Sequence, residues 1–308
     1  MSLLIKDLKM KYDCVVIGAG IAGMTAALYL KRAGVNSIII EKATPGGVLN
    51  RTSVVENYPG VSKIDGVSLA IQIYEQIKQM NIKYHYGDVQ EIKVENNQKY
   101  VVTSKETIFA KTIVIASGRI PRTLNLPNEE KLIGRGISWC AICDGFQYKG
   151  KKVAVVGSGN SAFEEALYLS KIASEVFLLY NSKKLKAESK LISKVKEQKN
   201  IILIPDLQIK QLKEKDNKLS AIILENEKQI DLSGVFIYIG YKPFIPYLDK
   251  LAINRKDNYL VVDNKMQTSI SGIYACGDVI CKEVYQLTTA VGEAAIAATS
   301  AKKQLDMM

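Results

Sequence analysis

Histidine is almost absent from this chain, since His85 is the single histidine among 308 residues. A histidine-based catalytic triad and a multi-histidine metal site are therefore excluded, and any proton donor must be another residue. Long apolar runs are absent too: none approaches the roughly 18 residues of a membrane span, and residues 1–10 do not form a signal-peptide core. We expect a cytoplasmic protein that does not enter a membrane, with His85 in a structural role in a strand.

Arginine is also scarce and occurs only at positions 32, 51, 119, 122, 135 and 255. The formal net charge is nevertheless +11, and most of the positive charge comes from lysines interspersed with aspartate and glutamate. Without arginine clusters or an aromatic stacking surface, this charge does not predict nucleic-acid binding. We interpret it as a solvated surface, with steering of an acidic protein partner or a phosphorylated cofactor as the functional alternative.

The cysteines are few, and their odd number, five, is scattered over a long chain. This is not the pattern of a disulfide-stapled secreted domain. Only Cys140 and Cys143 form a recognised motif, Cys-x-x-Cys. Cys14 precedes an apolar strand, where a thiol behaves as a small hydrophobic side chain.

The Cys-x-x-Cys motif is open to three interpretations: half of a zinc site, a redox pair, or a coincidence. Zinc would need two more ligands, and the spacing of Cys276 and Cys281 is not that of a zinc knuckle. Two cysteines three apart at a turn into a helix can close a small disulfide, and the helix N-terminus speeds thiol exchange. We therefore predict a redox-active pair and no bound metal.

Two glycine-rich turns each follow an apolar strand and open a helix. The first glycine loop, residues 18–23, lies between a strand at 13–17 and a helix through 24–30; the second glycine loop, residues 157–162, lies between a strand at 152–156 and a helix at 163–170. A further strand ends at Glu41 or at Tyr180, 23 residues after the first glycine in each case. A dinucleotide-binding motif requires this context, because its glycines let the backbone approach a pyrophosphate that rests on the helix N-terminus.

The repeated plan predicts an α/β fold of two Rossmann-like dinucleotide-binding domains. Two Gly-x-x-Pro stretches, residues 118–121 and 240–243, each follow an apolar strand and indicate linkers. We expect the second domain, residues 119–244, to be inserted into the first, which comprises residues 1–118 and 245–308. The returning segment would add a strand at 272–275 and a helix from about 287 to 302.

Further motifs complete the pattern: Glu56-Asn57-Tyr58-Pro59-Gly60, Ala116-Ser117-Gly118 and Gly277-Asp278-Val279. Together with the dithiol and both glycine loops, they make the chain resemble the low-molecular-weight thioredoxin reductases over nearly its whole length. The resemblance implies FAD in the first domain, NADPH or NADH in the inserted domain, a homodimer, and reduction of a thioredoxin-like protein disulfide.

The resemblance also assigns residues to the two cofactors. Gly18, Gly20 and Gly23 would hold the FAD pyrophosphate, and Glu41 would bind the adenosine ribose. The flavin and its ribityl chain would be approached by Gly46, Gly47, Val48, Asn57, Gly118, Gly277, Asp278 and Gln286. The nicotinamide dinucleotide would contact Gly157, Gly159, Asn160, Ser161, Lys183 and Lys186. Gly46 and Gly47 could instead only turn the chain, and Asp278 could only cap a helix.

The chain departs from the family pattern at three places. Val48 stands where the family usually has Gln, and Tyr285-Gln286 replaces Arg-Gln. Residues 180–186 lack the His-Arg-Arg and the further Arg that are typical of NADPH-specific members, and no acidic residue at position 180 selects NADH. Lysines at 183, 184 and 186 could still attract a phosphate, so we predict weakened discrimination between NADPH and NADH.

The implied electron path runs from the nicotinamide through FAD to the Cys140–Cys143 disulfide and on to a protein disulfide. By resemblance Cys143 would meet the flavin, and Asp144 is the candidate general acid because histidine is unavailable. The dithiol and the nicotinamide both need the flavin, so we expect rotation about the two Gly-x-x-Pro stretches. The alternatives are a ferredoxin-type donor, a thiol oxidase acting on oxygen, and a flavin-binding redox sensor without turnover.

Overall fold

The computed structural model describes residues 8–52 and 54–308. The chain divides into two compact units, of which the first contains the chain up to Ile120 and from Lys242 onward, and the second contains Pro121–Tyr241. Both divisions fall within the Gly-x-x-Pro stretches. There the short strands β7 (Arg119–Pro121) and β16 (Tyr241–Pro243) pair as a two-stranded sheet.

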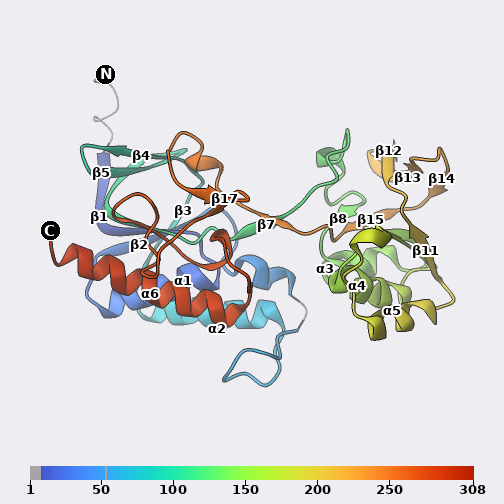
Figure 1. Cartoon of the computed structure of the whole chain (residues 1–308), viewed down its shortest axis with the longest axis horizontal. Helices are drawn as coiled ribbons and strands as arrows, with labels where there is room; N and C mark the ends of the chain where they lie inside the picture. Colours follow the sequence, from blue (N-terminus) through green and yellow to red (C-terminus); the bar gives the residue numbers. More distant parts are fainter. Residues whose placement is uncertain (1–7, 53) are drawn as a thin grey trace. The chain divides into compact units, whose positions relative to one another are not determined.

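The first unit is built on a seven-stranded sheet with the order β3-β2-β1-β6-β5-β4, and β19 pairs with β6 (Figure 1). The strands β1, β2, β3, β6 and β19 pair in parallel, whereas β4 and β5 form an antiparallel extension. Their bounds are β1 Leu8–Ile17, β2 Ser37–Glu41, β3 Lys83–Tyr86, β4 Val89–Glu95, β5 Gln98–Thr103, β6 Thr107–Ile115 and β19 Ile273–Ala275. The sheet therefore includes a strand from the far end of the chain.

Alternating side chains of β1 feed the cores on the two faces of this sheet. Cys14 and Val16 pack with α1 (Ile21–Arg32), α2 (Gly66–Gln79) and α6 (Leu287–Leu305) on one face. Val15 and Ile17 pack on the other face, against β4, β5 and the segment that carries β17 (Arg255–Lys256) and β18 (Tyr259–Leu260). A parallel strand buried on both faces carries a continuous apolar run, as Cys14–Ile17 of β1 does.

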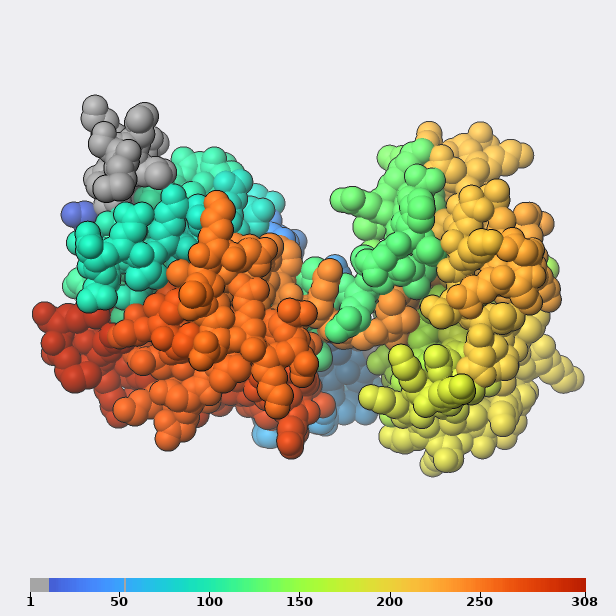
Figure 2. All heavy atoms as spheres, turned by 45° about the horizontal axis from the view of Figure 1, so that its top comes forward, coloured from blue at the N-terminus to red at the C-terminus, as the bar shows by residue number. Residues whose placement is uncertain are grey.

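Helices α1 and α6 lie side by side (Figure 1). The buried face of α6 is made of small residues: Ala290, Ala294, Ala297, Ala298 and Ala301. The C-terminal segment also lies against the region of β4 and β5. Figure 2 shows this at the surface, where the orange and red atoms of the C-terminal segment meet the cyan atoms. The C-terminal segment is therefore an integral part of the first unit.

The second unit repeats the plan with a five-stranded parallel sheet of order β11-β10-β9-β15-β8. Its strands are β8 Ile137–Ser138, β9 Lys152–Val156, β10 Glu175–Tyr180, β11 Ile201–Pro205 and β15 Gly234–Ile237. Helices α3 (Ala141–Asp144), α4 (Asn160–Ser170) and α5 (Ser189–Lys196) lie on one side. The other side packs against the antiparallel strands β12 Ile209–Lys215, β13 Lys218–Leu224 and β14 Gln229–Asp231.

In the first sheet, β3 lies beside β2, β2 beside β1, and β6 on the other side of β1. In the second sheet, β11, β10, β9 and β15 follow the same order. This order is that of a doubly wound dinucleotide-binding half. The expectation of an α/β fold with two Rossmann-like cores is confirmed. The observed helices are longer than expected, since α4 begins at Asn160 and α6 continues to Leu305.

Candidate active site

A disulfide joins Cys140 and Cys143 at the start of helix α3, with 5.3 Å between their Cα atoms. Cys140 is the residue that precedes the helix, and its Sγ accepts a hydrogen bond from the Cys143 backbone N–H at 3.2 Å. Cys140 is buried, whereas Cys143 is exposed. The sequence prediction of a paired dithiol is confirmed, and the two sulfurs differ in accessibility.

Two residues that sequence reasoning missed support this disulfide. The Ser138 hydroxyl donates to Oδ2 of Asp144 at 2.6 Å and accepts from the Cys140 N–H at 3.0 Å. The Ala141 N–H donates to the Tyr238 hydroxyl at 2.9 Å. Asp144, the predicted general acid, is thus held beside the dithiol by a serine. Nothing in the sequence marks Tyr238, which lies 97 residues beyond its partner.

The first glycine loop is shaped by close packing at two of its glycines and by open space at the third. A Cβ on Gly18, where φ is +102°, would lie 2.5 Å from the Ala116 carbonyl oxygen, and one on Gly23 would lie 1.8 Å from the Gly18 oxygen. A Cβ on Gly20 would meet nothing within 4 Å. Two glycines are therefore required by the fold, and the backbone at the start of α1 remains open to a ligand.

The second glycine loop has the same construction. A Cβ on Gly157 would lie 2.4 Å from the Tyr238 carbonyl oxygen, whereas one on Gly159 would meet nothing within 4 Å. Asn160 and Glu188 exchange hydrogen bonds of 3.0 and 2.9 Å across the start of α4, and Ser161 is exposed beside them. Both loops therefore fit a pyrophosphate in the manner that the motif requires.

Glu41 ends β2 and braces the first glycine loop. Its Oε2 accepts from the Ala19 N–H at 2.7 Å, and its Oε1 accepts from the Ala43 N–H at 2.8 Å. A cavity lies beside it, at the carboxyl ends of the parallel strands, and its lining includes Gly18, Glu41, Asp88, Ser117 and Tyr247. Ligands of doubly wound sheets bind at this edge.

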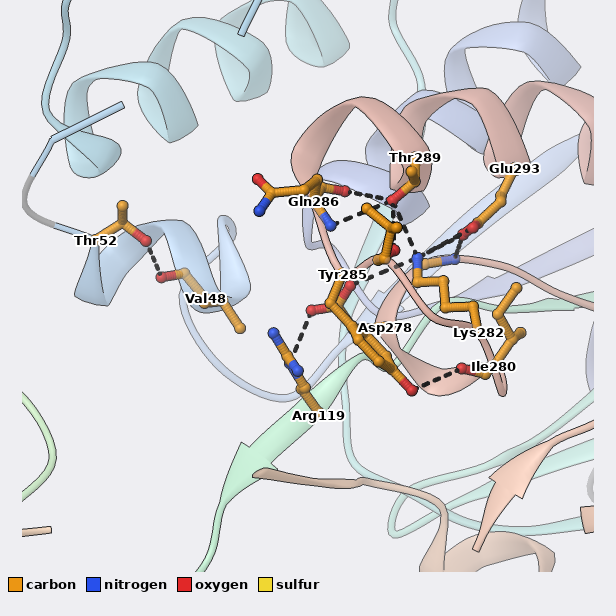
Figure 3. Close-up of polar contacts among 12 residues, drawn as sticks. Val48, Thr52, Arg119, Asp278, Ile280, Lys282, Tyr285, Gln286, Thr289 and Glu293 are labelled. Atoms are coloured by element: carbon orange, nitrogen blue, oxygen red, sulfur yellow. Dashed lines mark hydrogen bonds and ion pairs between the residues drawn. The ribbon is translucent and has the colours of Figure 1, made fainter. Parts of the chain in front are cut away.

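Other predicted flavin-site residues are brought together from distant parts of the chain. Gly46 pairs with Gly20 in an isolated bridge, and a Cβ on Gly47, where φ is +57°, would lie 3.3 Å from the Gly20 Cα. Asn57 donates its side-chain amide to Oε1 of Gln286 at 3.1 Å, across 229 residues. Val48 begins the turn after Gly47, where its carbonyl accepts from the Thr52 hydroxyl at 3.0 Å (Figure 3).

Asp278 lies within a network of charged side chains (Figure 3). Nε of Arg119 is 2.9 Å from its Oδ2, and Nζ of Lys282 is 3.7 Å from its Oδ1. Lys282 also contacts Glu293 at 2.8 Å, and Glu293 accepts from the Gly277 N–H at 2.9 Å. Burial raises the pKa of Glu293, and the contacts with Lys282 and Gly277 oppose that rise. Sequence reasoning placed Asp278 here but not Arg119, Lys282 or Glu293.

One departure from the family pattern lies beside this network of charged side chains. Position 285 carries tyrosine, and the Arg119 guanidinium lies 4.5 Å from the centre of that tyrosine ring. Gly118, with φ at +64°, lies between the end of β6 at Ile115 and Arg119, the first residue of β7. A guanidinium is therefore present beside Asp278, although it comes from a different part of the sequence.

The loop after β10 folds back onto the second glycine loop. The Asn181 N–H donates to the Ser158 hydroxyl at 2.9 Å, and the Lys186 N–H donates to the Ser158 carbonyl at 2.8 Å. Lys183 and Lys184 lie between these anchors in a short 3-10 helix, Ser182–Lys184, and are exposed. The predicted contacts Lys183 and Lys186 thus lie on the loop that borders the open backbone of Gly159.

The chain matches the family described as pyridine nucleotide-disulphide oxidoreductases over residues 12–295. The chain belongs to this family. Among pyridine nucleotide-disulphide oxidoreductases, it is 40% identical to the thioredoxin reductase of Ureaplasma parvum over 304 residues, which are 96% of this chain and 97% of that protein. It is 36% identical to the thioredoxin reductase of Bacillus subtilis over 300 residues, 96% of this chain and 95% of the relative.

Solved structures agree with this family assignment. The thioredoxin reductase of Lactococcus lactis, in a crystal structure of its FR conformation, superposes with a TM-score of 0.88 at 35% identity and covers 96% of this chain and 100% of that chain. Across residues 8–52 and 54–308, no helix combines the length and apolarity needed to cross a membrane.

Proposed function

We propose that this chain is an FAD-dependent thioredoxin-disulfide reductase that takes electrons from a nicotinamide coenzyme and passes them to a thioredoxin-like protein. The observation that carries the proposal is the Cys140–Cys143 disulfide in the same unit as the second glycine loop, alongside a first unit with its own glycine loop. The near full-length similarity to thioredoxin reductases supports the same activity.

The first unit, which we assign to residues 1–118 and 245–308, would bind FAD. Its pyrophosphate would lie at Gly18, Gly20 and Gly23, with Glu41 at the adenosine ribose and Asp278 at the ribityl chain. Gly46, Gly47, Val48, Asn57, Gly118, Gly277 and Gln286 would surround the flavin. When bound, FAD supplies two-electron chemistry that connects a hydride donor with a disulfide. The open Cβ direction of Gly20 is the feature that fits the group.

The second unit, assigned to residues 119–244, would bind the nicotinamide coenzyme through Gly157, Gly159, Asn160 and Ser161. Lys183 and Lys186 are candidate contacts on its border. Gly159 is open in the same way as Gly20, which supports a second pyrophosphate site. Rotation of the two units about β7 and β16, which would let both the dithiol and the coenzyme reach the flavin, stays a prediction.

The reduced dithiol would transfer its electrons by thiol exchange. One thiolate attacks the substrate disulfide, forms a mixed disulfide and releases a substrate thiolate. The second thiol then loses its proton, displaces the other substrate sulfur and restores the Cys140–Cys143 bond. Two electrons and two protons pass to the substrate. Asp144, oriented by Ser138, would hold and deliver the proton that the leaving thiolate needs.

Partners and location are part of the proposal. We expect a homodimer in the cytoplasm, with no nucleic acid and no membrane among its partners. The odd cysteine count and the interspersed charge support these expectations. The charge of +11 would favour an acidic protein substrate.

An anaerobic titration of the FAD-loaded protein tests the proposal against its alternatives. The expected result is bleaching of the flavin by NADH or NADPH, followed by the appearance of two thiols per chain that reduce a thioredoxin-like protein. Bleaching by reduced ferredoxin but by neither coenzyme would establish the other donor, and bleaching by dithiol alone would indicate a thiol oxidase. A flavin that bleaches without turnover would indicate a sensor.

A further inference from the structure

Asp206 places a carboxylate beside the loop that follows β10. It follows β11, the strand next to β10, and its backbone N–H donates to the Tyr180 carbonyl at 2.8 Å. The Ser182 N–H donates to Oδ1 of Asp206 at 2.7 Å, and the Ser182 hydroxyl donates to Oδ2 at 2.6 Å. The carboxylate is thus held two residues beyond the end of β10.

This position has a defined meaning in a Rossmann-like unit. An acidic residue about 20 positions after the glycine loop, at the end of the second strand, binds the ribose hydroxyls of NADH, whereas an arginine there accommodates the 2′-phosphate of NADPH. The end of the second strand here carries Tyr180, which has no carboxylate. Asp206, which follows the neighbouring strand β11, supplies a carboxylate that is close to this strand end in space although it is distant in the sequence.

The same contacts leave fewer hydrogen-bond donors on this loop for a 2′-phosphate. The Ser182 N–H and hydroxyl, two donors on the loop after β10, are already used by Asp206. Hydrogen bonds from Ser182 and the charge of Lys183 lower the pKa of Asp206, so its carboxylate is ionised at neutral pH. Lys183 therefore faces a negative charge of its own chain. No arginine occurs between residues 136 and 254 to replace it.

We propose that Asp206 is a specificity-determining residue that accepts the adenosine ribose hydroxyls and repels a 2′-phosphate, so that the enzyme prefers NADH to NADPH. This inference rests on the proposed function, because it assumes that the second glycine loop binds a nicotinamide dinucleotide. The sequence predicts only weakened discrimination between NADPH and NADH, whereas Asp206 predicts a preference for NADH. The lysines at 183, 184 and 186 would otherwise favour NADPH as point charges.

The first measurement compares kcat/KM for NADH and NADPH in the FAD-loaded enzyme and in Asp206→Asn. Asparagine tolerates the positive φ of 57° at this position. Its amide oxygen can still accept from the Ser182 N–H and its amide N–H can donate to the Ser182 hydroxyl, so the variant removes the charge and keeps both contacts, one of them reversed. We expect wild type to favour NADH, and the variant to shift the ratio toward NADPH by about tenfold, the order expected for one charge a few ångströms from a phosphate.

Asp216→Asn is the matched control. Asp216 is also an exposed aspartate with positive φ, 53°, in the same unit, but it lies in the turn between β12 and β13. The control should keep the wild-type ratio. A wild-type preference for NADPH, or equal shifts in the two variants, would overturn the inference.

A binding measurement separates this inference from the proposed function. Calorimetry of the FAD-loaded protein with 5′-AMP and with adenosine 2′,5′-bisphosphate reports the ribose site without turnover. We expect wild type to bind 5′-AMP more tightly, and Asp206→Asn to gain affinity for the bisphosphate alone. If both nucleotides bind wild type equally, the role of Asp206 is refuted while the coenzyme site stands. If neither binds and neither coenzyme bleaches the flavin, the proposed function itself fails.

Discussion

The Nε atom of Arg119 lies 2.9 Å from Oδ2 of Asp278, although 159 positions separate the two residues in the sequence. Arg119 comes from β7, at the point where the chain leaves the first unit, and Asp278 comes from the Gly-Asp motif proposed for the ribityl chain. Both side chains are about four-fifths covered, with 21% and 20% exposed. An ion pair this far from water constrains the carboxylate more than a surface pair does.

Removal of that arginine should weaken flavin binding. In Arg119→Ala, Asp278 loses the guanidinium that orients it, and the Tyr285 ring loses its cation. We expect the dissociation constant for FAD to rise about tenfold, which corresponds to one charged hydrogen bond. Fluorescence titration of the apoprotein with FAD measures it. The control is Arg122→Ala, because the Arg122 Nε donates a hydrogen bond of 3.1 Å to the Tyr241 carbonyl at the surface and contacts no carboxylate in the described part of the chain. An equal loss of FAD affinity in this variant would refute the special role of Arg119.

The paired cysteines should be indispensable for disulfide turnover but not for flavin colour. Cys140→Ser and Cys143→Ser each remove one sulfur of the disulfide, so reduction of a protein disulfide should fall by at least about a hundredfold. Absorbance should still show bound flavin. Cys281→Ser, which alters a free and partly exposed thiol, should retain wild-type turnover. Normal turnover in both disulfide variants would contradict the proposed function.

Asp144 should act at one step only. Asp144→Asn cannot deliver a proton, so kcat with the protein disulfide should fall about a hundredfold, while the rate of flavin bleaching by the coenzyme stays near wild type. Ser138→Ala should have a smaller effect of about threefold to tenfold on the same step, because it frees the carboxylate without removing it. Stopped-flow measurement separates the two half-reactions. Equal slowing of both would indicate a structural defect instead.

Stability of the second unit should fall as the pH rises from about 4.3 to about 7. Burial, with the neighbouring charge of Glu164, raises the pKa of Glu165 to about 7, and its Oε2 is buried without a hydrogen-bond partner among the described residues. A carboxyl whose folded pKa lies above its unfolded value of about 4.3 stabilises the fold most below that value and loses this contribution as pH rises through the folded pKa.

Glu165→Gln removes this titration. We expect its melting temperature to exceed that of wild type at pH 8 by on the order of 5 °C and to match it more closely at pH 5. Glu197→Gln, at an exposed position after α5, should show no such pH-dependent difference. Scanning calorimetry at the two pH values makes the comparison, and a gain of the same size at both would argue against a titrating Glu165.

The sequence predicts local structure and the glycine loops well, because both depend on short spacings. The strand at Ser37–Glu41 follows from its apolar run, and His85 lies in a strand as expected. Helix α4 begins at Asn160, earlier than its apolar pattern suggests, because Gly159 of the glycine loop is its N-cap residue.

Contacts between distant segments were not predictable in this way. Arg119 with Asp278, Ser182 with Asp206, and Ala141 with Tyr238 each depend on which strands lie next to one another and on how the following turn directs a side chain. No short spacing encodes them. The carboxylate that we propose for the ribose site was not predictable for the same reason, because Asp206 follows β11 and not β10.

The attachment of the second unit has a consequence for how such a chain can change. The Phe244 N–H donates to the Gly118 carbonyl at 3.2 Å, so the exit and the return of the chain are adjacent. Within the first unit, residues 121–241 therefore take the place of a short connection between β6 and the returning segment. A whole folded module can therefore be exchanged there at little entropic cost to its host.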